Sequence, residues 1–436
     1  MTYSEAQIWL YNQLPVFHRM GSAAYKADIS TTQRFMEVLG NPENKFKSIH
    51  IAGTNGKGSS SHLLASILKE SGKRTGLHTS PHLKDLRERI VIDGQMCPED
   101  YVIDFIETRE KEIKALSPSF FELMVGMAFN YFAKENIDVA VIETGMGGRL
   151  DSTNVVLPQC CLITNISFDH QQFLGNTLPM IAQEKAGIIK RGVPVVISQT
   201  QDEVKEVFIA KAKELGADIF LADENYEVRN SEYADGYLQM DIYRKGILFL
   251  EKVLCPLGGE YQNKNILGVL QTVEVLNSTG DYNISKQNIR DGIENLQHNF
   301  LLQGRWQKLS DKPLTICDTG HNTDGLQYVI NQLSTVKKEK LNFVLGVVND
   351  KDIDQEIDML PKDAFYFLCK ADIPRGLEVE VLADKFKSKG LEFSAFRSVE
   401  EAYSAAKSDA LKTNAMVFIG GSTYTVAELL SVIQKD

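Results

Sequence analysis

The sequence predicts an α/β protein built from two domains. Short runs of Val, Ile and Leu alternate with stretches of helical periodicity, which is typical of a parallel sheet covered by helices on both faces. The chain has 436 residues, more than one hydrophobic core usually serves. The pattern changes after residue 200, and a second set of apolar runs starts at residue 314. We therefore expect a sheet in each part of the chain.

Composition and charge restrict the class of protein. Hydrophobic residues make up 43% of the chain and charged residues 24%, which is ordinary for a globular protein, and no apolar run has the length of a membrane span. No basic and then apolar leader is visible, so we expect a cytoplasmic protein whose six cysteines are reduced core thiols. The net charge of −11 argues against nucleic-acid binding but allows a small anionic substrate, held locally.

The first domain is expected to alternate strands and helices. The apolar runs predict strands over 47–52, 137–143, 160–167 and 193–198. Apolar residues on one face predict a helix over 59–72, and a later helix is expected to end at Gly187.

Beyond residue 200 the chain is more polar and alternating. This predicts an antiparallel excursion over 219–243, followed by a helix over 260–280. Buried strands are predicted again over 314–320, 341–348, 364–371 and 415–421. An amphipathic stretch ends near Gln297–Leu302, so we expect one domain over 1–298 and a smaller α/β domain over 303–436.

The segment AGTNGKGSS, between the first strand and the first helix, predicts a phosphate loop. Glycine lets backbone N–H groups point toward an anion, and the helix presents its positive dipole end to it. Lys57 supplies a mobile charge for the β- and γ-phosphates, and Ser59 offers a hydroxyl toward phosphate or Mg²⁺. The strict pattern fails, because Ile51 replaces its first Gly and Gly58 follows Lys57. The alternative is a tight turn with a solvated lysine.

Polar residues follow the next predicted strands. Glu143 closes an apolar run at the carboxyl edge of the sheet, where α/β proteins bind ligands and an unpaired carboxylate is costly. His170 follows the next strand near the same edge, and Asp169 is a rival candidate. Glu143 and a neutral His170 can share a Mg²⁺-like ion, although His170 alone is more typical of a structural histidine. Lys185 alone is typical of a solvated helix charge.

Nine segments, taken together, carry a resemblance to a known family. In chain order they are HIAGTNGKGS, TSPHLKDLRERI, SFFE, ETGMGGRLDSTN, TNISFDH, EKAGI, GRWQ, DTGHNTDG and GSTYTVAEL. With them the chain closely resembles the folylpolyglutamate synthases, including the bifunctional bacterial form that is also a dihydrofolate synthase, within the Mur-type amino-acid ligases. The resemblance spans nearly the whole chain, and Gly58 after Lys57 is the family's own form of the loop.

The resemblance implies a Mur-ligase-type ATPase domain with a phosphate loop and a mostly parallel sheet, plus a smaller Rossmann-like C-terminal domain. It implies a ligase that uses ATP and Mg²⁺ to add L-glutamate to dihydropteroate, to reduced folates or to both. ATP phosphorylates a carboxylate, the glutamate amine attacks the acyl phosphate, and an amide forms with release of ADP and phosphate. Phosphorylation supplies the leaving group that a carboxylate lacks, while Lys and Mg²⁺ neutralise charge.

The family's site residues carry over to matching positions. The implied ATP-binding residues are Asn55, Gly56, Lys57, Gly58, Ser59, Asn265 (or Asn263) on the adenine side, Arg305 and Asp318. The implied metal ligands are Ser80, Glu143, His170 and Lys185, the last as a carbamate derived from CO₂. The implied pterin-binding residues are Ser119, Phe120, Phe121, Glu122, Leu150, Asp151 and Ser152. Lys57, Glu143, His170 and Lys185 form the implied catalytic set.

Several of these assignments have simpler alternatives. Ser80 alone would be interpreted as a cap, and one of the two Phe residues could be ordinary core. His321 lies next to Asp318, and residues 421–425 are expected near the glutamate pocket. Thr319, Gly320 and Ser152 depart from common family residues, which leaves the pterin substrate open. Since both domains contribute to the ATP site, we expect domain closure to assemble it.

Three other functions compete with this one. A Mur-type cell-wall ligase would lack SFFE and carry an extra N-terminal domain, for which the residues before the phosphate loop leave no room. A GTP-driven switch would carry an Asn-Lys-x-Asp run, which the sequence lacks. A non-catalytic folate- or nucleotide-binding protein would tolerate loss of Lys57 or Glu143, and both are present. The resemblance further suggests a monomer, and the charge and the lack of a long apolar run make nucleic acid and membrane unexpected partners.

Overall fold

The computed structural model describes residues 1–13, 28–349 and 353–433. The chain forms two compact units. Unit 1 holds Met1–Ser231, Gln239–Pro256 and Tyr261–Leu302, and unit 2 holds Glu232–Leu238, Leu257–Glu260 and Gln303–Asp436. Two short pieces from before residue 298 therefore group with unit 2. Local sequence patterns cannot reveal this grouping, because it depends on contacts between residues far apart in the chain.

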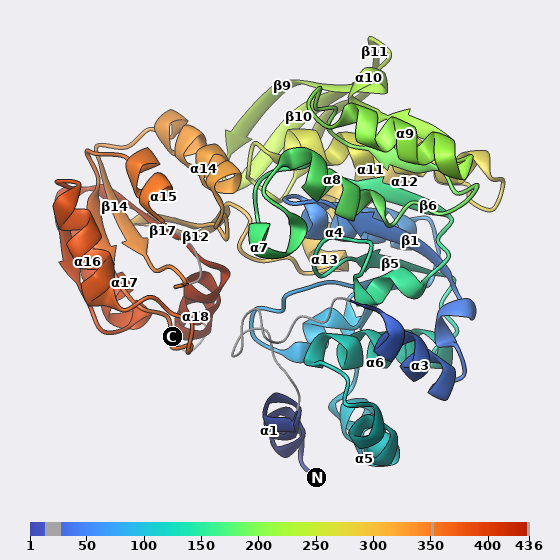
Figure 1. The fold of residues 1–436 in the computed structure, drawn as a ribbon. Helices are drawn as coiled ribbons and strands as arrows, with labels where there is room; N and C mark the ends of the chain where they lie inside the picture. Colours follow the sequence, from blue (N-terminus) through green and yellow to red (C-terminus); the bar gives the residue numbers. More distant parts are fainter. Residues whose placement is uncertain (14–27, 350–352, 434–436) are drawn as a thin grey trace. The chain divides into compact units, whose positions relative to one another are not determined.

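Unit 1 is built on an eight-stranded sheet (Figure 1). In spatial order its strands are β4 (Gln95–Met96), β3 (Val91–Ile92), β2 (Thr75–His78), β5 (Val139–Glu143), β1 (Lys47–Ala52), β6 (Cys160–Ile163), β7 (Val195–Ile197) and β8 (Ile219–Leu221). Six strands, β2, β5, β1, β6, β7 and β8, run parallel to one another. At one edge, β3 pairs antiparallel with both β2 and β4. The predicted mostly parallel sheet is confirmed.

Helices cover both faces of this sheet, because successive side chains of a strand point to opposite sides. Cys161 and Ile163 of β6 pack with α8 (Leu178–Ala186) and α9 (Lys205–Leu215). Leu162, between them, lies against α11 (Gln262–Ser278), where a Cβ on Gly268 would come within 2.9 Å of it. The remaining helices of unit 1 are α1 (Tyr3–Gln13), α3 (Ser30–Val38), α4 (Lys57–Glu70), α5 (Glu99–Leu116), α6 (Phe120–Lys134), α7 (Gln171–Leu174), α10 (Ala222–Asn225), α12 (Lys286–Glu294) and α13 (Leu296–Asn299).

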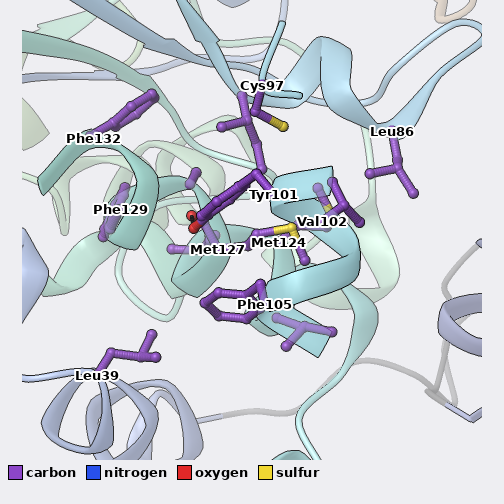
Figure 2. Close-up of a cluster of buried hydrophobic side chains, with 14 of the residues drawn as sticks. Leu39, Leu86, Cys97, Tyr101, Val102, Phe105, Met124, Met127, Phe129 and Phe132 are labelled. Atoms are coloured by element: carbon purple, nitrogen blue, oxygen red, sulfur yellow. Dashed lines mark hydrogen bonds between the residues drawn. The ribbon is translucent and has the colours of Figure 1, made fainter. Parts of the chain in front are cut away.

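A hydrophobic core lies where α5 and α6 pack together (Figure 2). Tyr101 of α5 is 7% exposed, and Met127 and Phe129 of α6 are fully buried. The Tyr101 hydroxyl donates to the Met127 backbone oxygen at 2.8 Å, so this polar group is satisfied inside the core. The same core includes Ile142 of β5 and therefore holds α6 on the sheet.

The predicted strands of unit 1 are found, but several are shorter than the apolar runs that predicted them. The run over 160–167 forms a strand only to Ile163, and the polar residues after it become a loop at the carboxyl edge of the sheet. The predicted helices over 59–72 and up to Gly187 are found as α4 and α8. All six cysteines lie in the described part of the chain, where they are buried and not in disulfides.

The polar, alternating stretch forms a separate three-stranded sheet. Its strands are β9 (Tyr226–Ala234), β10 (Tyr237–Arg244) and β11 (Ile247–Cys255). The turns Asp235–Gly236 and Lys245–Gly246 join them, with φ between 48° and 89° at all four residues. Positive φ at both central residues is typical of tight hairpin turns, so consecutive strands run antiparallel, as predicted.

Unit 2 has a six-stranded sheet of its own. In spatial order its strands are β12 (Gln307–Asp311), β13 (Leu314–Cys317), β17 (Ala415–Gly420), β14 (Lys340–Leu345), β15 (Phe365–Leu368) and β16 (Phe393–Ala395). Only β12 runs antiparallel to its neighbour. The helices are α14 (Thr323–Thr335), α15 (Asp354–Met359), α16 (Val379–Ser388), α17 (Val399–Thr413) and α18 (Thr423–Ile433). The predicted second α/β domain is confirmed. Across both units, the described helices include none long and apolar enough to cross a membrane.

Candidate active site

The loop over residues 53–56 joins β1 to α4, which is the strand–turn–helix context of a phosphate loop. Gly53 has φ 150° and Gly56 has φ 86°, values that favour glycine. A Cβ on Gly53 would come within 1.8 Å of the Thr164 hydroxyl, and one on Gly56 within 2.2 Å of Asn265 Oδ1. At both positions the backbone conformation and the nearby atoms exclude a larger side chain, so glycine is required.

The segment after β6 holds this loop in place. The Thr164 hydroxyl donates to the Asn55 backbone oxygen at 2.6 Å, and the Asn55 backbone N–H donates to Asn165 Oδ1 at 2.7 Å. The Asn55 side chain donates to the Ser167 hydroxyl at 3.3 Å. These contacts fix the shape of the loop without a ligand. Sequence reasoning singled out Asn55 but missed Thr164 and Asn165, which only the adjacency of β1 and β6 brings to the loop.

A buried amide network ties the start of α11 to the start of α4. The Gln262 side chain donates to the Ser59 hydroxyl at 3.0 Å, and the Asn265 side chain donates to Gln262 Oε1 at 2.8 Å. Ser59 and Gln262 are at most 1% exposed. Asn265 thus lies directly against the loop at Gly56, and Gln262 is a site residue that the sequence analysis missed. A cluster of polar residues at the start of an otherwise apolar helix could have pointed to Gln262 in the sequence.

Two lysine side chains converge on one carbonyl oxygen of the loop. Lys57 Nζ donates to the backbone oxygens of Gly53 at 3.1 Å and Thr54 at 3.0 Å. Lys185, on α8, donates to the same Gly53 oxygen at 2.8 Å. Lys185 is only 3% exposed, so it is not a solvated helix charge. The structure thereby brings two residues of the predicted catalytic set together at the loop.

Burial changes the chemistry of Lys185. Burial and, to a smaller extent, the nearby Lys57 charge lower the pKa of the Lys185 ammonium to about 7, against the opposite effect of Asp169 and Asp151. Near pH 7 a large share of Lys185 is therefore the neutral, nucleophilic amine. The effect of Asp169 also places this carboxylate, the rival candidate beside His170, near the same ammonium.

Ser80 and Glu143 follow or end the neighbouring strands β2 and β5. The Ser80 backbone N–H donates to Glu143 Oε2 at 3.2 Å, and Glu143 is 4% exposed. His170 precedes α7 with φ 50°, and its Nε2 lies 3.9 Å from Asp169 Oδ2. Within the described residues, no three His, Cys, Asp or Glu side chains gather as a metal site. Of the predicted metal ligands only Glu143 and His170 are of these types, so the set depends on Ser80 and a modified Lys185.

The predicted pterin segment SFFE opens α6 with a capping box. The Ser119 hydroxyl accepts from the Glu122 N–H at 3.2 Å, and Glu122 Oε2 accepts from the Ser119 N–H at 2.6 Å. Both side chains therefore satisfy backbone donors at the start of this helix. Their proposed contact with a pterin stays a prediction.

The two Phe residues of this segment lie in different surroundings. Phe120 is 4% exposed and stacks on Tyr11, with ring centroids 5.4 Å apart, so it belongs to the core. Phe121 is partly exposed. Its ring lies against Gly145, where an added Cβ would come within 2.5 Å of the ring. Of the two rings, Phe121 is the one available to cover a flat ligand.

Asp151, in the partner segment, is a buried carboxylate surrounded by donors. Its Oδ2 accepts from the Met146 N–H at 2.8 Å, and its Oδ1 accepts from the Thr153 N–H at 3.0 Å. Burial raises the pKa of the Asp151 carboxyl, and these hydrogen bonds oppose that shift. Ser152 is 9% exposed and Leu150 is half-buried beside it.

In unit 2, Asp318 follows β13 and is 3% exposed. Its two oxygens accept from the Trp306 N–H and the Gly320 N–H, each at 2.7 Å. Arg305 donates to the Thr319 hydroxyl and, at 3.2 Å, to the Gly304 oxygen. Thr319, which departs from the common family residue, thus positions Arg305.

A cavity of about 30 Å³ lies at the carboxyl edge of the unit 2 sheet. His321, Glu356 and Gly421 are among its lining residues, which are otherwise mostly apolar. Glu356 Oε2 is buried and has no hydrogen-bond partner among the residues that the structure describes. Residues 421–425 lead from β17 into α18, where the Thr425 hydroxyl donates to the Gly346 oxygen at 2.9 Å.

Comparison with known proteins places this geometry among ligases. The model of the Mur ligase middle domain matches residues 51–273, and that of the Mur ligase glutamate ligase domain matches residues 304–423. The chain is 32% identical to a folylpolyglutamate synthase of Lacticaseibacillus casei over 386 residues, covering 86% of this chain and 87% of that one.

Two further likenesses extend over almost the full length. The chain is 29% identical to a dihydrofolate synthase/folylpolyglutamate synthase of Bacillus subtilis over 444 residues, covering 98% of each. Its fold matches that of E. coli FolC in complex with DHPP and ADP with a TM-score of 0.85 and 26% identity, over 100% of this chain and 98% of that one.

Proposed function

This chain belongs to the Mur ligase family, among relatives named folylpolyglutamate and dihydrofolate synthases, and we propose that it adds L-glutamate to dihydropteroate, to reduced folates or to both. The substrate carboxylate takes the γ-phosphoryl group of ATP. The glutamate amine then displaces phosphate from the acyl phosphate, and an amide, ADP and phosphate result. One observation carries the proposal: Lys57 and Lys185 meet at Gly53 of a phosphate loop. The cell-wall ligase alternative has no comparable support.

ATP is proposed to occupy the loop over residues 53–59. Its backbone N–H groups and the first turn of α4 favour negative charge there. The Lys57 ammonium, which donates to Gly53 and Thr54, would turn to the phosphates when the nucleotide binds. Charge neutralisation and in-line positioning are the main needs of phosphoryl transfer.

Mg²⁺ is proposed to bind beside this loop, where it would neutralise charge on the transferred phosphoryl group. Glu143, buried at the end of β5, and Ser80 next to it supply the oxygen ligands that Mg²⁺ prefers. A carbamate on Lys185 would add a third oxygen donor, and it would replace repulsion between Lys57 and Lys185 by attraction. His170 completes the proposed set.

The carbamate has a direct test. Because the pKa of Lys185 is about 7, its neutral amine can react with CO₂ near neutral pH. Carbon NMR with isotopically labelled CO₂ should show a carbamate signal that grows as pH rises through 7. Lys185→Arg should lack the signal, and Lys213→Arg, at an exposed position of α9, should retain it. A signal that survives Lys185→Arg would contradict the assignment.

The pterin is proposed to lie against Phe121 and Asp151. The partly exposed ring of Phe121 offers an aromatic face, and Asp151 offers a carboxylate that can accept from ring N–H groups. Phe121→Ala should raise the KM for the pterin substrate, whereas Phe120→Ala should act mainly on stability, because Phe120 is core.

L-Glutamate is proposed to bind against the cavity of unit 2, whose volume of about 30 Å³ has room only for a group as small as its ammonium. The buried oxygen of Glu356, which lacks a partner among the described residues, suits the ammonium group of an amino acid. Residues 421–425 lie at the same edge of that sheet. Glu356→Gln should raise the KM for L-glutamate and leave the KM for ATP unchanged.

An activity panel tests the function as a whole. Purified protein with ATP, Mg²⁺ and L-glutamate is given dihydropteroate in one arm and reduced folates in the other. We expect phosphate release that requires glutamate, together with a product one glutamate longer, in at least one arm. Absence of glutamate-dependent release with every pterin would contradict the proposed function.

Two coarser properties complete the proposal. We place the protein in the cytoplasm, a reducing compartment that suits its buried thiols. We also propose a monomer, which light scattering coupled to size exclusion would test.

A further inference from the structure

A series of buried hydrogen bonds connects Asp151 to β1, the strand that leads into the phosphate loop. His50 of β1 is fully buried, and its Nε2 lies 2.8 Å from the Thr153 hydroxyl oxygen. The Thr153 hydroxyl in turn donates to Asp151 Oδ1. No step of the proposed function uses His50 or Thr153, although both are completely buried.

The direction of this chain follows from its protons. An ionised carboxylate only accepts, so the single proton of the Thr153 hydroxyl points to Asp151. The Thr153 oxygen can then only accept from His50, which places the ring proton of His50 on Nε2. Nδ1 of His50 is buried and has no partner among the described residues, as suits a nitrogen without a proton. Burial also lowers the pKa of His50 to about 3, so the ring is neutral at physiological pH.

Asp151 needs these donors because burial favours its protonated form. Burial raises the pKa of the Asp151 carboxyl, and the hydrogen bonds from Thr153, Met146 and Gly145 lower it. A protonated carboxyl would present a donor toward the ligand, whereas the edge of an aminopterin ring presents N–H donors of its own. Loss of one donor from within the protein therefore destabilises the ionised carboxylate that the ligand requires.

We propose that His50 is a positioning residue for the acyl substrate: through the Thr153 hydroxyl it holds Asp151 as an oriented, ionised acceptor for the N–H groups of the pterin ring. This inference rests on the proposed function, since it takes Asp151 as the pterin-binding carboxylate. The structural chain from His50 to Asp151 can be tested without any substrate.

Nitrogen NMR of the histidine side chains tests that structural chain. The His50 signals are assigned by their loss in His50→Gln. We expect a neutral ring with its proton on Nε2, unchanged between pH 6 and 8. A ring protonated on Nδ1 would overturn the proposal, whatever the kinetic measurements show.

Steady-state kinetics tests the role in binding. His50→Leu and Thr153→Val each remove one link, and each should raise the KM for the pterin substrate that the activity panel selects roughly tenfold, as expected for one lost hydrogen bond. The kcat and the KM for ATP should stay within about twofold. His50→Gln keeps an N–H donor and should recover most of the affinity, and the double variant His50→Leu/Thr153→Val should be no worse than either single variant.

Each outcome decides between positioning and bulk packing. A fall in kcat together with equal rises in the KM for ATP and the KM for the pterin substrate would assign His50 a merely structural role and overturn the proposal. If His50→Leu does not fold, Thr153→Val, with Thr153→Ser as its matched control, carries the kinetic test, and full affinity in Thr153→Val would refute the inference. A wild-type protein without pterin-dependent turnover would instead refute the proposed function, and the NMR measurement would still judge the hydrogen-bond chain.

Discussion

At the scale of single residues, Lys57 is the mobile charge of the phosphate loop. Its ammonium already lies on the loop, bonded to the Gly53 and Thr54 oxygens, so it needs only a rotation to reach a phosphate. We predict that Lys57→Ala lowers kcat about 100-fold or more, because a charge that stabilises phosphoryl transfer is lost. Lys213→Ala, on the exposed face of α9, is the matched control and should retain activity. Unchanged turnover in Lys57→Ala would refute the assignment of the loop.

The buried histidines should determine part of the acid sensitivity of the fold. Burial lowers the pKa of His50 to about 3 and that of His78 to about 4. Unfolded histidine takes up a proton below about pH 6.5, and the folded ring does not, so stability falls as pH drops through that window. Each such group contributes a slope of about 1.4 kcal/mol per pH unit.

Replacement of one buried ring tests this prediction. His50→Gln should flatten the fall in the free energy of unfolding between pH 6.5 and about 4, measured by urea titration. His298, on an exposed position of α13, is the control, and His298→Gln should leave the slope unchanged. An unaltered slope in His50→Gln would show that His50 is not buried as a neutral ring.

At the scale of elements, the turn between β1 and α4 decides the geometry of the nucleotide site. Gly56 has φ 86°, and a Cβ there would come within 2.2 Å of Asn265 Oδ1. We predict that Gly56→Ala costs about 1–3 kcal/mol of strain and raises the KM for ATP roughly tenfold or more. Calorimetry and initial-rate measurements check the two parts separately.

Gly72 offers a matched control at the other end of α4. It has a similar φ of 83°, but a Cβ there meets no atom within 4 Å. Gly72→Ala should therefore show a backbone penalty alone and normal ATP affinity. Equal KM values for ATP in the two variants would mean that the contact between Gly56 and Asn265 does not shape the site.

The sequence predicted these elements well where hydrophobic pattern and edge position decide the outcome. The run before Gly53 formed β1 over its predicted length, and Glu143 and Ser80 met at the carboxyl edge because parallel strands end together. The capping role of Ser119 and Glu122 could also have been predicted from their spacing alone. The spacing of these two residues is visible in the sequence, but the sequence analysis assigned both of them to ligand binding.

At the scale of the whole molecule, long-range contacts limited the prediction. The bond from Gln262 to Ser59 joins residues 203 positions apart, and no local pattern indicates it. The burial of Lys185 likewise depends on α8 packing beside the loop, which a helix pattern with one lysine cannot show. Unit 2 includes Glu232–Leu238 and Leu257–Glu260, pieces that chain order alone would assign to the first unit.

The fold therefore follows largely from local patterns, and the chemistry of the site follows from the residues that the folded chain brings together.

The central claim is that the substrate carboxylate is activated as an acyl phosphate before glutamate attacks it. In that reaction one carboxylate oxygen of the substrate leaves with the phosphate. Simple hydrolysis of ATP would take this oxygen from water instead.

Oxygen-isotope transfer measures this difference most directly. Dihydropteroate, or the reduced folate that the activity panel selects, is prepared with labelled carboxylate oxygen and incubated with the enzyme, ATP, Mg²⁺ and L-glutamate. Mass spectrometry of the released phosphate should find one labelled oxygen for each amide formed. Phosphate without label, released while amide accumulates, would contradict the account.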